Sequence, residues 1–160
     1  MPRVVTMKLN SRSVEQVIDE VNAYRNEVVR IASELGQALV EEGIQIAKLK
    51  ISILDAIETG AMLNDVNGLF DTTTGKGFIK VDAGHAAYVE FGTGVVGQMT
   101  KSLAIDKPSG WGHDLNQHGW QGWVYDHGRW TRGMSPRPFM WYTWYELCEK
   151  AEEMVRLRYG

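Results

Sequence analysis

The residues best suited to chemistry lie in one stretch of the C-terminal half of the chain. Histidine and aspartate gather there, at His113, Asp114, His118, Asp126 and His127. A metal site needs several such ligands within roughly 2.0–2.2 Å of one ion. The spacing of His113 and His118 matches no specific ligand motif. We therefore interpret these side chains as parts of a polar loop, with metal binding as the less favoured alternative.

Other arrangements that support catalysis are equally incomplete. Ser109, His113 and Asp114 are the residue types of a nucleophilic triad. The residues around Ser109 do not, however, form a nucleophile elbow. Gly92-Thr93-Gly94 is rich in glycine, but it lacks the lysine of a phosphate-binding loop and the glycine spacing of a dinucleotide-binding turn. We therefore predict that the chain is not an enzyme and needs no metal or cofactor.

The composition is ordinary for a soluble protein with its own core. The 160 residues are 44% hydrophobic and 23% charged, and the formal net charge is −3. This length fits a single domain over residues 1–160. A net negative charge argues against specific nucleic-acid recognition, which usually needs an excess of basic residues. Cys148 is the only cysteine, so it cannot form an intrachain disulfide, and no apolar run approaches the ~18 residues of a membrane span.

Hydrophobic periodicity predicts a long N-terminal helix. We expect it to begin at Ser13 as N-cap, after a flexible arm or edge strand at residues 1–12. Its apolar seam has the members Val14, Val17, Val21, Tyr24, Val28, Ile31, Leu35 and Ala38. Such a seam packs either on the protein's own sheet, which is the commoner use, or on another subunit. Gly36 and Gly43 indicate a bend or close packing, and residues 44–57 fit a continuing helix better than a strand.

The rest of the chain predicts short strands and a second long helix. We expect strands between residues 63 and 82, a short buried helical turn closed by Gly92, an elaborated loop at 95–134, and a final helix that starts near Pro138. Within that loop, residues 95–119 look irregular, and residues 123–131 predict a β-hairpin with a glycine in its turn. The predicted fold is therefore α+β: long N-terminal and C-terminal helices packed on a small, mostly antiparallel sheet, with a Trp-rich hairpin insertion.

Tryptophan is concentrated in the last fifty residues, which contain all six copies. Such a density of aromatic side chains can form a sugar-stacking or protein-binding surface. It can equally form a small satellite core that fixes the loop to the last helix. Both interpretations stay open for the tryptophans of the loop and hairpin, which are Trp111, Trp120, Trp123 and Trp130.

Two short blocks resemble a known family. The sequence His85-Ala86-Ala87-Tyr88-Val89-Glu90-Phe91-Gly92-Thr93-Gly94 is similar to the central block of a family of tailed-bacteriophage tail components, the "gene product ten" type of lambdoid phages. Ser135-Pro136-Arg137-Pro138-Phe139-Met140 resembles the family's Arg-Pro-Phe block before a C-terminal helix. Thr59-Gly60-Ala61-Met62-Leu63 is a weaker third match. The resemblance covers residues 13–157, with a longer link at 95–134 than many relatives have.

The resemblance implies a structural virion protein of the head–tail junction, in the neck or tail-completion region. Such subunits act in rings, usually six- or twelve-fold, between connector or head-closure proteins and tail-tube or tail-terminator proteins. The implied location is the virion, after assembly in the host cytoplasm. The alternative function is a phage-encoded binding module that recognises carbohydrate or protein through the Trp-rich hairpin.

Within these blocks, the expected structural and assembly residues are Tyr88, Glu90, Phe91, Gly92, Gly94, Arg137, Pro138 and Phe139. We expect Tyr88 and Phe91 to be buried anchors. Gly92 and Gly94 should adopt backbone conformations closed to other residues. Because a charge inside an apolar block needs a partner, we predict that Glu90 pairs with Arg137 and locks the turn to the last helix.

Overall fold

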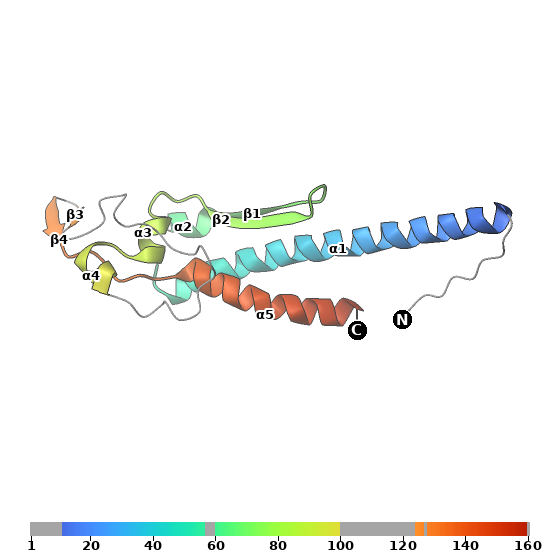
Figure 1. Cartoon of the computed structure of the whole chain (residues 1–160). Coiled ribbons are helices and arrows are strands. Elements are labelled where there is room, and N and C mark those ends of the chain that lie inside the picture. Colours follow the sequence, from blue (N-terminus) through green and yellow to red (C-terminus); the bar gives the residue numbers. More distant parts are fainter. Residues whose placement is uncertain (1–10, 57–59, 100–123, 127, 160) are drawn as a thin grey trace.

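The computed structural model describes residues 11–56, 60–99, 124–126 and 128–159. Two long helices run side by side, and a β-hairpin lies along them (Figure 1). This arrangement confirms the predicted α+β class. In chain order the elements are α1 (Ser11–Ile53), α2 (Ala61–Asn64), β1 (Val66–Asp71), β2 (Lys76–Val81), α3 (Ala86–Phe91), α4 (Gly94–Met99), β3 (Val124–Asp126), β4 (Arg129–Thr131) and α5 (Phe139–Tyr159).

Helix α1 is one continuous helix of 43 residues. At a rise of 1.5 Å per residue it is about 65 Å long. It already includes Ser11, so the prediction of Ser13 as N-cap was wrong. Residues 11–12 are helical and do not belong to a flexible N-terminal segment or an edge strand. Residues 1–10 lie outside the described residues. The helix continues to Ile53, which confirms the helical interpretation for residues 44–53, whereas residues 54–56 leave the helix through a turn and do not form the last part of the predicted helix.

The two glycines inside α1 serve close packing. A Cβ on Gly36 would collide with the ring of Phe70 in the hairpin, and one on Gly43 would collide with the side chain of Ile79. Both glycines therefore let the sheet approach the helix backbone. Phe70 and Ile79 share one face of the hairpin, because β1 and β2 pair antiparallel with Gly68 opposite Ile79 and Phe70 opposite Gly77.

The hydrophobic core lies at the base of the hairpin, where the C-terminal end of α1 meets α2, α3 and the start of α5. There Ile51 and Phe139 are almost fully buried. Away from the core, α1 and α5 are joined by ion pairs, with Lys50 Nζ 2.6 Å from Glu146 and Lys150 bonded to Glu42. The buried apolar cluster consists of Ala47, Ile51, Ala56, Met62, Val66, Ala83, Ala86, Val89 and Phe139.

The elaborated loop is partly regular. Residues 95–99, predicted as irregular, belong to helix α4. The predicted second hairpin is confirmed: β3 and β4 pair antiparallel, and Gly128 occupies the connection with φ 83°. This hairpin forms its own two-stranded sheet. Residues 100–123 lie outside the described residues.

The N-terminal part of α1, which we call the arm (residues 12–28), extends past the hairpin tip and past the end of α5 (Figure 1). Most of the seam side chains in the arm are exposed: Val14 by 37%, Val21 by 52%, Tyr24 by 56% and Val28 by 39%. Further along the same seam, Leu35 and Ala38 are half-buried. The seam thus packs on the protein's own body only in its second half.

Candidate functional site

Glu90 is the centre of the candidate site. It lies on α3, and its side chain is only 5% exposed. Its Oε2 accepts a hydrogen bond from the backbone N–H of Met140 at 2.9 Å, and its Oε1 accepts one from the N–H of Trp141 at 3.1 Å. These donors lie in the first turn of α5, where backbone N–H groups have no partner within the helix. Glu90 therefore caps α5 from a different helix.

The charge state of Glu90 reflects two opposed effects. Burial raises the pKa of its carboxyl group to about 7, because a low-dielectric surrounding disfavours the ionised form. The N–H groups of Met140 and Trp141 act against this shift, since they bond the ionised form better. Both oxygens are engaged with backbone, so the side chain is held in place. We interpret Glu90 as a structural group rather than a proton donor or acceptor.

Arg137 does not pair with Glu90, and that prediction was wrong. Its Nη1 donates to the backbone carbonyl oxygen of Asp55 at 2.6 Å. Asp55 follows the end of α1 and has a left-handed backbone with φ 51°, so Arg137 satisfies a carbonyl at a helix C-terminus. The backbone N–H of Arg137 also donates to the carbonyl oxygen of Val89 at 2.7 Å. The second block therefore contacts both α3 and the end of α1.

A short ladder joins the glycine segment after α3 to the chain before α5. The N–H of Thr93 donates to the carbonyl oxygen of Met134 at 3.0 Å, and the N–H of Met134 donates back to Thr93 at 3.2 Å. Gly92 has φ 73° and Gly94 has φ 61°, which confirms the expected backbone conformations. A Cβ on Gly92 would lie 2.7 Å from the nitrogen of Pro136. The glycines thus permit the close approach of the two segments.

Sequence reasoning missed the other side of this ladder. Gly133 has φ 85°, and a Cβ there would collide with the carbonyl group of Thr93. The signal in the sequence was the glycine that ends Trp130-Thr131-Arg132-Gly133, because glycine readily adopts a positive φ. Gly133 and Thr93 therefore belong to the same packed unit as Glu90, although neither was among the expected structural residues.

The aromatic members of the first block lie differently from expectation. Tyr88 is 36% exposed and Phe91 is only half-buried, so the prediction that both are buried anchors was wrong. On a helix, residues three or four positions apart share a face. Ala86, Val89 and Glu90 therefore share the buried face of α3, and the remaining residues point elsewhere. The buried aromatic anchor is Phe139 of the second block, which is 1% exposed and follows the buried Pro138.

We call this unit the junction: Val89, Glu90, Gly92, Thr93, Gly133, Met134, Arg137, Phe139 and their bonds to Asp55, Met140 and Trp141. It brings together the two blocks that carry the family resemblance. Every polar side-chain partner in it is a backbone group. The arrangement holds the ends of α1, α3 and α5 in fixed positions.

The Trp-rich surface is only partly described. Trp130 on β4 is 66% exposed. Trp111, Trp120 and Trp123 lie outside the described residues, as do Ser109, the three histidines of the loop and hairpin turn, and Asp114. Among the described residues, no group of three or more His, Cys, Asp or Glu side chains is placed to hold a metal ion. In that same part of the chain, no helix is long and apolar enough to cross a membrane.

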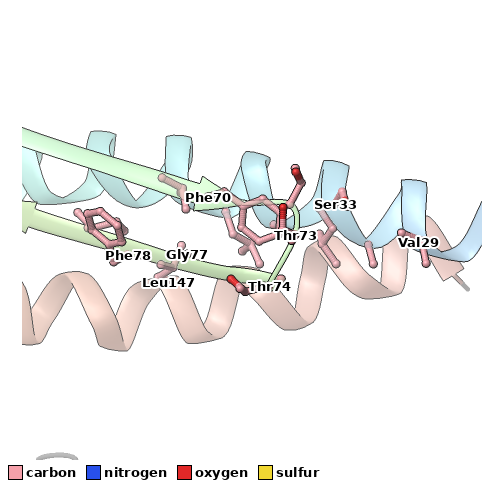
Figure 2. Close-up of a pocket in the computed structure, with 16 residues that line it drawn as sticks. Val29, Ser33, Phe70, Thr73, Thr74, Gly77, Phe78 and Leu147 are labelled. Carbon is pink, nitrogen blue, oxygen red and sulfur yellow. The ribbon is translucent and has the colours of Figure 1, made fainter.

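An open apolar groove lies between α1, the hairpin and α5, near the hairpin tip. Figure 2 shows it with Val29 and Ser33 on α1, Phe70 at the end of β1 and Leu147 on α5. Its volume is about 660 Å³. The groove begins where the arm ends, because Val29 is the first residue of α1 that lines it. The arm and the groove each leave apolar side chains exposed.

Scans of known families, of curated proteins and of solved structures found no match to this chain.

Proposed function

We propose that this protein is a structural subunit of a tailed-phage head–tail junction, in the neck or tail-completion region. In this role it assembles with copies of itself in a ring and contacts connector or head-closure proteins on one side and tail-tube or tail-terminator proteins on the other. It would act in the virion, after assembly in the host cytoplasm. The family resemblance implies a six- or twelve-fold ring.

The observation that carries the proposal is the junction. The two blocks that resemble the phage family are far apart in the sequence, yet they form one packed unit around Glu90. The polar groups of that unit bond to backbone, which suits a part that fixes helix geometry and does not suit a catalytic centre. A rigid body with an uncovered apolar arm and groove is consistent with assembly, because monomeric proteins rarely leave large apolar patches exposed.

The test is assembly of phage particles without this protein. We expect infection by a phage that lacks the gene to accumulate separate heads and tails. Purified protein added to this lysate should restore their joining. Glu90→Ala should restore joining poorly, because it leaves the α5 donors uncapped. Glu152→Ala, which alters an exposed side chain on α5, should restore it fully. Normal joining without the protein would contradict the proposal.

The exposure of Trp130 favours a second candidate function, a module that binds carbohydrate or protein. Its side chain is 66% exposed on a short hairpin, where aromatic rings stack on sugars or insert into partner surfaces. Titration calorimetry against host cell-wall glycans distinguishes this function. Binding that is lost in Trp130→Ala but kept in Trp144→Ala, another exposed tryptophan, would favour it over the structural role.

A further inference from the structure

Beside the junction lies another cavity, which the proposed function does not use. It is an open pocket of about 200 Å³ between the end of β2, α3 and the start of α5. Glu90 is the only charged residue that lines it. The pocket therefore combines one carboxyl group with an apolar wall. The residues of that wall are Val81, Ala86, Ala87, Phe91, Phe139 and Met140.

The carboxyl group at this pocket can accept further hydrogen bonds. A carboxylate oxygen has two lone-pair sites, and each oxygen of Glu90 uses one of them for a backbone N–H of α5. One site on each oxygen is left for another donor. Because the two N–H groups already hold the side chain in place, a ligand meets a carboxyl group whose position is fixed before binding.

No ion pair among the described residues neutralises this carboxyl group. Arg137, which precedes α5, donates to the carbonyl oxygen of Asp55 instead. Burial raises the pKa of the Glu90 carboxyl group to about 7, and the two N–H groups oppose that shift only in part. An ionisable group that is perturbed by burial and lies in a cleft is typical of a binding site.

We propose that this pocket binds an alkyl cation, an ammonium or guanidinium group on a short apolar stem, with the cation against Glu90. Such a ligand matches both parts of the pocket. Its charge pairs with the carboxylate where Coulomb attraction is weakly screened, and its stem contacts apolar side chains. An anion would be repelled by Glu90, and an uncharged apolar molecule would leave the carboxylate without a counter-charge.

The volume of the pocket limits the ligand to a small group. Sites for complete small-molecule ligands occupy roughly 300–1,000 Å³, which exceeds the volume of this one. A stem of about four carbons, as in lysine, is the appropriate scale. Two sources carry this chemistry: the basic side chain of another protein and a free alkylamine. The inference does not rest on the proposed function, because either source would bind the isolated chain.

Nuclear magnetic resonance titration of the full-length protein with n-butylammonium chloride tests the site. The backbone amides of Met140 and Trp141 report on it directly, because both donate to Glu90. We expect the signals of these two amides to shift and to reach saturation. 1-Butanol, which has the same carbon chain without the charge, is the matched ligand and should bind at least tenfold more weakly.

Two variants separate the charge of the pocket from its shape. Glu90→Gln removes the charge with little change in size and should weaken butylammonium binding at least tenfold. Ala87→Leu fills the pocket from α3, at a half-buried position, and should weaken binding equally without altering the carboxyl group. It keeps the test valid if Glu90→Gln folds poorly. Glu152→Gln, an exposed residue outside the pocket, should bind like the wild type.

A second ligand, Nα-acetyl-lysine methylamide, distinguishes the two sources. Binding of this ligand as well as butylammonium supports a basic side chain of another protein, whereas binding of butylammonium alone supports a free amine. Equal binding of butanol and butylammonium would overturn the proposal, because the pocket would then recognise only the apolar stem. Unchanged binding in Glu90→Gln, or amide signals of the wild type that never reach saturation, would also overturn it.

Discussion

The buried carboxyl group of Glu90 gives a pH-dependent test of the junction. Its pKa is raised from 4.5 to about 7, mainly because burial disfavours the ionised form. Two backbone N–H groups of α5 partly oppose that effect. Glu90→Gln is the informative change, because the amide has nearly the same size, keeps one acceptor oxygen and carries no charge at any pH.

The direction of the effect follows from the raised pKa. The folded protein binds this proton more tightly than the unfolded chain does, so the contribution of Glu90 to the free energy of unfolding is fully present below pH 4.5. That contribution is lost as the pH rises through the folded-state pKa of about 7. At 1.36 kcal/mol per pKa unit, the loss amounts to roughly 3 kcal/mol.

Urea unfolding of the wild type and of Glu90→Gln, at pH values from roughly 4.5 to 8, measures this loss. We expect the stability of the wild type relative to the variant to fall by roughly 3 kcal/mol over that range. The comparison cancels the titration of the other carboxylates. Glu152→Gln, an exposed position on the same helix, should show no such trend. A relative stability that stays level or rises with pH would refute the reasoning, because the N–H donors would then outweigh burial.

Two further substitutions test the backbone contacts of the junction. Gly133→Ala should lower the free energy of unfolding by about 3 kcal/mol or more, since it combines a positive φ with a collision at Thr93. Gly75→Ala, with positive φ but open space, should cost only about 1–2 kcal/mol, and equal losses in the two urea melts would contradict the collision. Arg137→Ala removes the bond to the Asp55 carbonyl and should cost roughly 1–2 kcal/mol in the same assay, so an unchanged urea midpoint would argue that water replaces it.

The helices could be predicted from the sequence because their periodicity is local. The extent to which α1 is covered could not. Each hairpin strand has six residues and spans about 20 Å, whereas α1 has 43 residues and spans about 65 Å. One seam therefore continues from the body into solvent. Nothing in the seven-residue repeat of the seam marks the position near Val28 where the rest of the protein stops covering it.

The junction was predicted in its location but not in its bonds. Glu90 needed a partner, and the second block supplies it, but through the backbone of α5 rather than the side chain of Arg137. A search for opposite charges overlooks the unpaired N–H groups at a helix start. The relevant sequence signal was that α5 has no acidic residue in its first turn and that Pro138 precedes it, so its donors needed a cap from elsewhere.

The two ends of α1 differ in how far the rest of the protein covers them. The junction holds the C-terminal end of that helix through Arg137 and Asp55, and the arm lies at its other end (Figure 1). Substitutions at Glu90 should therefore change the free energy of unfolding with little direct effect on the arm. A substitution of Val21 should leave the free energy of unfolding nearly unchanged, because that side chain is 52% exposed.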